Sequence, residues 1–458
     1  MEYDIVIIGA GPGGYETAVA AARKGLSVAV IEKSDLGGTC LNYGCIPTKC
    51  LCHTAEILKL VKDSASHGIH ANDLQFDFAS AIQRKNQIVR QLQSGIDTLM
   101  KTPGITLYRG EAHLADANTV NVLVVGANGT KEVADVIKTK NIIIAAGSVT
   151  KFLPIEGAHA PGVVTSTEML NLTTIPKRLC IIGGGVIGLE FASIYHSFGS
   201  EVTVVEFCKE ILPNFDRDLA KRLRTSLKKR GMTFYTGAAA KSILSGDCMT
   251  VTYEEKGKEK TIDADLVLMA VGRTANVGSL NLDDLNIAYT PKGIEVDGNM
   301  QTSVPGIYAI GDVNGLLQLA HAAKAQGIIA LEHILHGKTH KSALDLGIIP
   351  AAVFTVPEAA MVGKTEEQLM DSGVAYNVYK SFYRANGKAL SMDAEDGIVK
   401  ILASEDGKLL GAHILGAHAS DLIHELAILM IKGGSVHDIS NTVHAHPSLS
   451  EIILSAAE

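Results

Sequence analysis

A glycine-rich turn between an apolar strand and a helix occurs twice in the sequence, with the two copies 174 residues apart. Each copy continues into a second apolar strand that ends in an acid, Glu32 or Glu206, and each acid lies 23 residues after the first glycine. A strand, glycine turn, helix, strand and acid in this order form the βαβ unit that binds a dinucleotide. The repeat therefore predicts an α/β protein with two Rossmann-like dinucleotide-binding domains. The glycines of the two turns are Gly9, Gly11 and Gly14, and Gly183, Gly185 and Gly188.

The residue types in these turns suit a dinucleotide. Glycine lets the backbone approach a pyrophosphate, and unpaired N–H groups at the helix N-terminus favour its charge. The acid accepts hydrogen bonds from ribose hydroxyls, and a carboxylate at Glu206 would repel the 2′-phosphate of NADP. We therefore expect NAD at the second turn, with a flavin nucleotide as the companion that electron transfer requires. Two glycine turns without any ligand are the alternative interpretation.

The composition excludes several classes of protein. The chain has 458 residues and a formal net charge of −8 without a long single-sign block, which argues against a nucleic-acid-binding footprint and a polybasic membrane anchor. No apolar run approaches the roughly 20 residues that span a bilayer. The N-terminus enters an apolar strand without a basic region or a cleavage site, so we expect no signal peptide and a cytoplasmic location.

The length predicts about three domains, at roughly 150 residues for each. Apolar strands that end in glycine are predicted at 141–147, 265–272 and 306–311. The stretch from 55 to 100 is predicted to form a long amphipathic helix, and 105–140 is predicted to form short strands with turns. After about residue 345, alternating strands and helices indicate a compact α+β domain.

Four of the seven cysteines lie within thirteen residues, at positions 40, 45, 50 and 52. Without a visible export signal, such a cluster indicates redox or metal chemistry rather than structural disulfides. Residues five apart on a regular helix lie roughly 8.7 Å apart, which exceeds the ~7 Å limit for a disulfide. A Cys40–Cys45 bridge would therefore need a distorted turn, which Gly44 and Pro47 permit, and it would be easily reduced. Spacing alone leaves the pairing open, because Cys45 and Cys50 are also five residues apart.

Two other interpretations of the cysteine cluster stay open at this point. Zinc or an iron–sulfur cluster is one of them, although the pattern Cx4Cx4CxC fits no zinc spacing well. Inert buried thiols are the other. Cys50 and Cys52 are expected to be core residues of the helix that follows.

The segment Gly37 to Lys49 resembles the redox-disulfide motif of the pyridine nucleotide–disulfide oxidoreductases. The resemblance covers essentially the whole chain in order, from the first glycine turn to a C-terminal His-Pro motif, and it is strongest to the dihydrolipoyl dehydrogenase branch. It implies an FAD-binding domain in two parts, 1–147 and 273–345. It further implies an NAD-binding domain over 148–272 and a C-terminal interface domain over 346–458.

The resemblance also implies roles for single residues. Cys40 would exchange with the substrate, and Cys45 would be the charge-transfer thiol that faces the flavin. Lys49, paired with Glu190, would lie beside flavin N5, and a solvated surface lysine is the alternative. Asp312 would bind the ribityl chain, and the helix that opens at Ala320 would face the pyrimidine carbonyl. Further cofactor contacts are implied at Ala112 and, in the NAD site, at Gly272 and Arg273, where Thr274-Ala275-Asn276 departs from the usual family pattern and leaves the loop contacts open.

The C-terminal His-Pro motif supplies a base. Thiol–disulfide exchange needs a thiolate, and a thiol with a pKa of ~8.5 is mostly protonated at neutral pH. A histidine with a carboxylate behind it can take up that proton. The family pattern gives these roles to His446, just before Pro447, and to Glu451, and places His446 at the disulfide of the other subunit. In the alternative interpretation, Pro447 is the first residue of a helix and Glu451 lies in its first turns. His444 is interpreted as a bystander.

Together these features predict an enzyme that oxidises protein-bound dihydrolipoyl groups and reduces NAD+ to NADH through FAD and a Cys40–Cys45 disulfide. We expect a homodimer that serves a lipoylated acyltransferase or a glycine cleavage carrier protein, without metal, nucleic acid or membrane. Mercuric reductase is disfavoured because the C-terminus lacks a cysteine pair, and glutathione reductase is disfavoured by Glu206. Another flavoprotein disulfide reductase, or a mainly structural subunit of a multienzyme complex, is the alternative.

Overall fold

The computed structural model describes residues 2–126, 128–337, 342 and 344–458. Two compact units are present, and each contains segments that are far apart in the sequence. The chain passes between the units five times. The first unit comprises Met1–Pro47, Gln83–Lys151 and Arg273–Leu346, and the second comprises Thr48–Ile82, Phe152–Gly272 and Gly347–Glu458.

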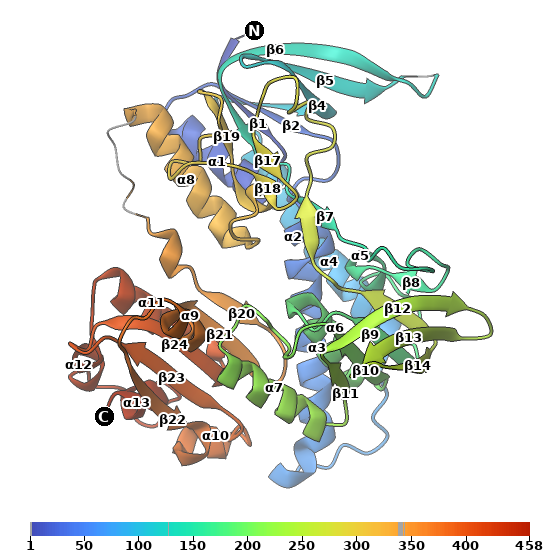
Figure 1. Cartoon of the computed structure of the whole chain (residues 1–458), viewed down its shortest axis with the longest axis vertical. Helices are drawn as coiled ribbons and strands as arrows, with labels where there is room; N and C mark the ends of the chain where they lie inside the picture. Colours follow the sequence, from blue (N-terminus) through green and yellow to red (C-terminus); the bar gives the residue numbers. More distant parts are fainter. Residues whose placement is uncertain (1, 127, 338–341, 343) are drawn as a thin grey trace. The chain divides into compact units, whose positions relative to one another are not determined.

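A sheet with the strand order β3-β2-β1-β6-β5-β4 forms the centre of the first unit, and β19 also pairs with β6. Strands β1, β2, β3, β6 and β19 pair in parallel, whereas β4 and β5 extend the sheet as an antiparallel arm (Figure 1). Ile5 and Ile7 of β1 are fully buried, as expected for a parallel strand with both faces covered. The bounds are β1 (Glu2–Ile8), β2 (Val28–Glu32), β3 (Ile105–Arg109), β4 (Glu111–Asp116), β5 (Thr119–Val125), β6 (Lys131–Ile144) and β19 (Ile307–Ala309).

Helices α1 (Pro12–Arg23) and α8 (Ala320–His336) pack against each other in the first unit. The short helix α2 (Gly38–Tyr43) follows β2, and the 3-10 turn η2 (Gly311–Asn314) follows β19. Two-stranded sheets complete this unit. They pair β7 (Ser148–Thr150) with β16 (Arg273–Ala275), and β17 (Tyr289–Thr290) with β18 (Gly293–Ile294).

Residues 152–272 of the second unit contain a parallel sheet in the order β11-β10-β9-β15-β8. Helix α6 (Val186–Phe198) joins β9 to β10 and is buried along most of its length, including Phe191 and Tyr195. A three-stranded antiparallel sheet, β12-β13-β14, is inserted before β15. The remaining bounds are β8 (Val163–Val164), α5 (Ser166–Met169), β9 (Arg178–Ile182), β10 (Glu201–Glu206), α7 (Arg217–Lys229), β11 (Thr233–Thr236), β12 (Ala238–Ser245), β13 (Met249–Glu255), β14 (Lys258–Ala264) and β15 (Leu266–Met269).

The C-terminal part of the second unit is an antiparallel sheet in the order β20-β21-β24-β23-β22, and helices α11 and α13 pack on it. This arrangement matches the compact α+β domain that the sequence predicts. The bounds are η3 (Leu346–Ile348), β20 (Ala351–Val353), β21 (Glu358–Gly363), α9 (Glu366–Asp371), β22 (Asn377–Phe382), η4 (Tyr383–Ala385), α10 (Gly387–Ser391), β23 (Ile398–Ala403), β24 (Leu409–Gly416), α11 (Ala419–Ile431), α12 (Val436–Ser440) and α13 (Glu451–Ala457).

Two local predictions from the sequence are wrong. The stretch from 55 to 100 is not one helix, because α3 (Cys45–Asp63) and η1 (Ser64–His67) end at Gly68, which adopts the left-handed φ of 75°, and α4 (Phe78–Leu99) starts ten residues later. The apolar residues before and after this break both follow a helical periodicity, so the sequence pattern does not indicate the break. The segment 105–140 also contains more than short strands, since β6 is a single strand of 14 residues that continues into the apolar run at 141–144.

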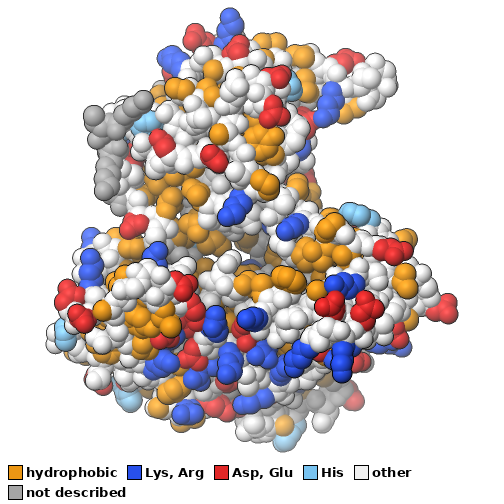
Figure 2. All heavy atoms as spheres, viewed as in Figure 1, with side chains coloured by type: hydrophobic (Ala, Val, Ile, Leu, Met, Phe, Trp, Pro, Cys, Tyr) orange, Lys and Arg blue, Asp and Glu red, His pale blue; other side chains and the backbone are white. Residues whose placement is uncertain are grey.

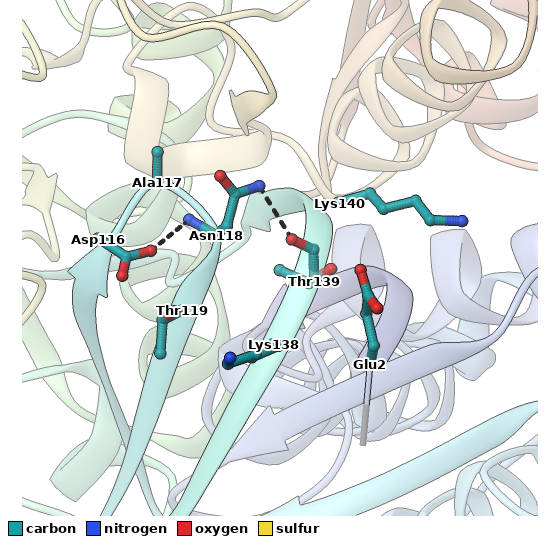
Figure 3. A pocket seen from close by; sticks show the side chains of 8 residues that line it. All are labelled: Glu2, Asp116, Ala117, Asn118, Thr119, Lys138, Thr139 and Lys140. Atoms are coloured by element: carbon teal, nitrogen blue, oxygen red, sulfur yellow. Dashed lines mark hydrogen bonds between the residues drawn. The ribbon is translucent and has the colours of Figure 1, made fainter.

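No helix in the described parts of the chain is both long and apolar enough to cross a membrane. Acidic, basic and apolar side chains are mixed over the face of the molecule in Figure 2. One pocket of about 490 Å³ lies in the first unit, where polar side chains surround the start of β1 (Figure 3). It lies at the end of β1 opposite the glycine turn, so it is separate from the site described below. Its lining residues are Glu2, Asp116, Ala117, Asn118, Thr119, Lys138, Thr139 and Lys140.

Candidate active site

The first glycine turn is held in place by Glu32. The carboxylate of Glu32 accepts the backbone N–H of Ala10 at 2.7 Å and that of Ser34 at 2.8 Å. Gly9 has a left-handed φ of 100°, and a Cβ on Gly14 would lie 1.9 Å from the carbonyl oxygen of Gly9. Only glycine fits at these two positions, because a side chain would displace the backbone. The backbone N–H groups at the N-terminus of α1 are therefore not covered by side chains from this turn.

The second glycine turn repeats this construction around Glu206. Its carboxylate accepts the N–H of Gly184 at 2.5 Å and that of Cys208 at 2.6 Å. Gly183 has a φ of 112°, and a Cβ on Gly188 would lie 2.1 Å from the carbonyl oxygen of Gly183. The two repeats found in the sequence therefore have the same local structure.

Both turns fit the pyrophosphate of a dinucleotide. Gly11 and Gly185 are the N-cap residues of α1 and α6, with extended backbone at φ −71° and −79°. The nearest atom to a Cβ on Gly11 would be Gly38 Cα at 3.9 Å, and a Cβ on Gly185 would meet nothing within 4 Å. Each helix N-terminus therefore faces space that a side chain on this glycine would occupy, which is the cradle that a phosphate group needs.

Cys40 and Cys45 lie close together, across a break between two helices. Helix α2, which carries Cys40, ends at Tyr43, and Cys45 starts α3. Gly44 between them is not helical, with φ −146° and ψ −112°, and a Cβ there would lie 3.0 Å from the carbonyl oxygen of Thr39. The distorted turn that a Cys40–Cys45 bridge requires is therefore present at Gly44, whereas Pro47 lies inside α3.

The other two clustered cysteines face different surroundings. Cys52 packs against the core of the second unit, and burial raises the pKa of its thiol. Cys50 lies on α3 and is half-buried. This position of Cys52 matches the prediction that it is a core residue. No group of three or more His, Cys, Asp or Glu that could hold a metal ion occurs within the described ranges.

Lys49 and Glu190 form an ion pair in the second unit. Lys49 Nζ lies 2.9 Å from each carboxylate oxygen of Glu190, whose side chain is only 4 % exposed. The residue after β20 supports the pair, because the N–H of Phe354 donates to Glu190 Oε1 at 3.0 Å and Lys49 Nζ lies 4.6 Å from the centre of the Phe354 ring. Lys49 is thus held by an acid and an aromatic ring rather than being a solvated surface lysine.

The other predicted flavin-side residues, unlike Lys49 and Glu190, lie in the first unit. Asp312 is the second residue of η2, and its Oδ2 accepts the hydroxyl of Ser148 at 2.6 Å. Ala320 is the first residue of α8, as predicted, so the helix N-terminus lies there. Ala112 belongs to β4, with its methyl group buried in the core.

The two residues predicted at the NAD site, Gly272 and Arg273, are neighbours in the sequence but belong to different units. Gly272 is exposed, with a left-handed φ of 105°. Arg273 instead donates from Nε to Ser148 Oγ at 2.7 Å, which connects it to Asp312. In the atypical segment after it, Thr274 and Ala275 belong to β16, and Asn276, which follows the strand, donates from its side chain to the carbonyl oxygen of Ala146 at 3.1 Å.

His446 and Glu451 form the predicted dyad. His446 Nδ1 lies 2.9 Å from Glu451 Oε1, and Glu451 Oε2 accepts the N–H of Ser448 at 2.8 Å. These hydrogen bonds, from Ser448 and then from His446, lower the pKa of Glu451. The alternative role for Pro447 as the first residue of a helix is wrong, because α13 begins at Glu451 after the N-cap Ser450.

The side chain of His444 is largely buried and paired with an acid, which leaves its predicted role as a bystander open. Its Nε2 lies 2.9 Å from Glu425 Oε1, and its side chain is 5 % exposed, whereas that of His446 is 82 % exposed. The sequence also gave no indication of Ser148 or Phe354, because each meets its partner across more than 100 residues. Ser148 directly follows the glycine that ends a predicted strand, which was the one local signal near either residue.

Comparisons with known proteins agree over nearly the whole chain. Residues 3–327 match the pyridine nucleotide-disulphide oxidoreductase family, and residues 349–457 match the dimerisation domain of pyridine nucleotide-disulphide oxidoreductases. The chain is 42 % identical to a dihydrolipoyl dehydrogenase of Geobacillus stearothermophilus, over all of this chain and 96 % of the relative. It is 41 % identical to a mitochondrial dihydrolipoyl dehydrogenase of Pisum sativum, over all of this chain and 91 % of the relative.

A solved structure is also similar along its full length. The HOCl-induced flavoprotein disulfide reductase RclA from Escherichia coli, in a Cu(II) complex, has a TM-score of 0.87 and 31 % identity. The match covers all of this chain and 99 % of that one. With two glycine turns, a cysteine pair at a helix break and full-length relatives, the chain belongs to the pyridine nucleotide–disulphide oxidoreductase family.

Proposed function

We propose that the protein oxidises protein-bound dihydrolipoyl groups to lipoyl groups and reduces NAD+ to NADH. The observation that carries this proposal is the pair Cys40 and Cys45, close together at a helix break directly after the first glycine turn. The full-length similarity to relatives named dihydrolipoyl dehydrogenase supports the choice of substrate. In this proposal the two thiols are the redox centre.

The exchange runs between the dithiol of the substrate and the Cys40–Cys45 disulfide. One substrate thiol loses its proton and attacks Cys40 Sγ, so a new S–S bond forms while the Cys40–Cys45 bond breaks and Cys45 leaves as a thiolate. The second substrate thiol then attacks the substrate sulfur of the mixed disulfide and releases Cys40. Two electrons have moved from the substrate to the cysteine pair, and the oxidised lipoyl group departs.

His446 takes up the substrate's thiol proton in this scheme. Glu451, whose pKa is lowered by hydrogen bonds from Ser448 and His446, holds the imidazole through Nδ1 and stabilises the charge that forms. The exposed position of His446 suggests that it acts on a second copy of the chain. Apolar side chains on the same C-terminal segment support a homodimer, since Ile428 is 61 %, Ile431 60 % and Val443 97 % exposed.

Membership of the family implies FAD and NAD(H) as cofactors. The residues present fit both, because each glycine turn leaves a phosphate cradle and each acid is poised beside it. We assign FAD to the first turn, with Asp312 and the N-terminus of α8, and NAD to the second turn with Glu206. When bound, FAD supplies the two-electron chemistry that restores the disulfide and reduces NAD+.

We propose the following domains on this basis: FAD binding by 1–147 and 273–345, NAD binding by 148–272, and the subunit interface by 346–458. The changes of unit after Lys151, Gly272 and Leu346 lie close to three of these boundaries, whereas residues 48–82 of the proposed FAD-binding part belong to the second unit. The lipoyl group would be presented by an acyltransferase or a glycine cleavage carrier protein. The cytoplasmic location stays a prediction that cell fractionation can test.

A comparison of substrates tests the proposal. We expect the purified holoenzyme to form one NADH for each dihydrolipoyl group, with a lipoylated carrier domain preferred over free dihydrolipoamide. Cys45→Ser should abolish this reaction, and Cys248→Ser should not. NADH-dependent reduction of Cu(II) or of glutathione disulfide at a higher kcat/KM would instead favour another disulfide reductase. A yellow homodimer without any turnover would favour the structural subunit.

A further inference from the structure

Arg273, Ser148 and Asp312 form a chain of hydrogen bonds within the first unit. Arg273 donates from Nε to Ser148 Oγ at 2.7 Å and from Nη2 to the carbonyl oxygen of Ser148 at 2.6 Å. Ser148 Oγ donates to Asp312 Oδ2 at 2.6 Å. A guanidinium only donates, so the single hydroxyl hydrogen of Ser148 has to point at Asp312. Arg273 thereby fixes the direction of the bond that holds the carboxylate.

The surroundings strengthen this chain. Ser148 is 8 % exposed, and Arg273 and Asp312 are half-buried. Burial lowers the pKa of Arg273, and the charges of Asp312 and Cys45 oppose that shift. An arginine remains charged under such conditions, and charge-assisted hydrogen bonds in a partly dry site are stronger than neutral ones and polarise one another.

Ser148 and Arg273 also stand where the chain leaves the first unit and returns to it. The unit ends its second segment at Lys151 and resumes at Arg273. Strands β7 and β16 pair there, with Arg273 opposite Thr150 and Ala275 opposite Ser148. This short ribbon brings the two side chains together although 125 residues separate them.

The backbone around Asp312 is held separately. Gln326, which is fully buried, accepts the N–H of Gly311 at 2.6 Å and the side-chain N–H of Asn314 at 2.8 Å. Among the residues that the structure describes, none donates to Asp312 Oδ1. The turn thus has a fixed backbone and one carboxylate oxygen that can accept a hydrogen bond from a ligand, and the orientation of that oxygen depends on Ser148.

We propose that Arg273 is a positioning residue for Asp312, acting through Ser148, and that it controls retention of the flavin nucleotide rather than recognition of NAD. This inference rests on the proposed function, in which Asp312 binds the flavin. Without the guanidinium, the Ser148 hydroxyl can rotate toward other acceptors, and Asp312 loses its defined donor. FAD should then dissociate more readily while the second glycine turn, in the other unit, is unchanged.

A double-mutant cycle on FAD affinity tests this proposal. The dissociation constant of FAD is measured by flavin fluorescence during reconstitution of the apoprotein. We expect Arg273→Met and Ser148→Ala each to weaken FAD binding by about tenfold, the effect of one charge-assisted hydrogen bond, and the double variant to be no weaker than the more affected single variant. Ser148→Thr should restore binding, and Arg273→Lys should be intermediate because it cannot make both bonds. The KM for NAD should stay unchanged.

The controls separate this inference from its premise. Arg178→Met removes an exposed guanidinium that pairs with Asp265 in the second unit and should leave FAD affinity unchanged. A KM for NAD that rises more than the FAD dissociation constant, or single effects that multiply in the double variant, would overturn the proposal. Unchanged FAD affinity in Asp312→Asn would overturn the flavin assignment itself, and with it this inference. Should Arg273→Met not fold, Ser148→Ala, which removes one buried hydroxyl, carries the same test.

Discussion

The two glycine turns are alike down to single hydrogen bonds, yet they differ in what lies against them. In both turns, the carboxylate of the acid accepts two backbone N–H groups. In both, the carbonyl oxygen of the residue after the first glycine also accepts an N–H from the segment that follows the acid. Gly37 donates to Ala10 in the first turn, and Leu212 donates to Gly184 in the second. At the first turn, the segment after the acid packs against the cradle. The approach is close, since a Cβ on Gly38 would lie 2.8 Å from Gly11 Cα. At the second turn Gly185 faces open space.

Under the proposed function, this difference lets one motif serve two roles. The segment that covers the first turn is the start of α2, which carries Cys40, so the thiol pair is attached directly to that cradle. A covered cradle suits a nucleotide that stays bound beside the thiols, and an open one suits a nucleotide that enters and leaves with each turnover. The glycine motif is the same in both turns, so the segment after the acid determines whether the cradle suits a bound or an exchanging nucleotide.

The largest expected effect comes from the thiol that distinguishes the first turn. Cys40→Ser removes the sulfur that the substrate thiolate attacks and should lower dihydrolipoamide oxidation by at least about a thousandfold, while flavin remains bound. Cys208→Ser is the matched control, because Cys208 holds the position after Glu206 that Ser34 holds after Glu32. That control should keep full activity. Steady-state NADH formation measures both, and near-normal turnover in Cys40→Ser would contradict the comparison.

A smaller effect is expected from an alanine in each cradle. The backbone at Gly11 and Gly185 accepts alanine, and a Cβ would meet no atom closer than 3.9 Å, so both variants should fold normally. The methyl group would occupy the space of a phosphate and should weaken nucleotide binding by roughly 10- to 100-fold, or about 1.4–2.8 kcal/mol.

The two alanine variants should separate the cofactors. Gly11→Ala should lose flavin colour, and Gly185→Ala should stay yellow with a raised KM for NAD. Absorbance of the purified proteins and NAD titrations give these readouts, and thermal unfolding of the apoproteins checks folding. If Gly185→Ala lost flavin, the assignment of the two turns would be reversed.

The last expected effect is on stability rather than on activity, and it concerns a buried histidine in the second unit. Burial lowers the pKa of His413 to about 4. The positive charge of Lys400 lowers this pKa further, and the negative charge of Asp216 only partly opposes the shift. The unfolded chain binds a proton on this histidine below about pH 6.5 and the folded chain does not. Stability should therefore fall as pH drops from 6.5 to 4, by at most about 1.4 kcal/mol per pH unit.

The carboxylate beside His413 acts in a different pH window. The pKa of Asp216 is lowered, so its contribution to stability is lost only below its usual value of 3.8. His413→Gln, which can keep the bond to the Lys364 carbonyl oxygen, should flatten the slope between pH 6.5 and 4. Urea unfolding at pH 7 and pH 5 measures the change in the free energy of unfolding with pH. The same change in the variant and in the parent protein would show that His413 does not cause the loss of stability.

The sequence predicted the parts of the molecule whose signals are local. The glycine turns with Glu32 and Glu206 and the distorted turn at Gly44 follow from residue types at fixed spacing, whereas the start of α8 was implied by the family resemblance. Contacts between distant segments could not be predicted in this way. Ser148 meets Asp312 across 164 residues and Phe354 meets Glu190 across 164 residues, and no periodicity reports such a pairing. The break after Gly68 was missed because a helical pattern resumes beyond it.

The most direct test of the account separates the two half-reactions in one pair of variants. NADH oxidation by ferricyanide needs the two nucleotides but not the thiols, whereas dihydrolipoamide oxidation needs all three. The account predicts that Cys40→Ser retains the ferricyanide reaction and loses the dithiol reaction, and that Gly185→Ala loses both at low NAD(H) and recovers both at high NAD(H). Loss of the ferricyanide reaction in a flavin-loaded Cys40→Ser protein, or dithiol oxidation without Cys40, would contradict it.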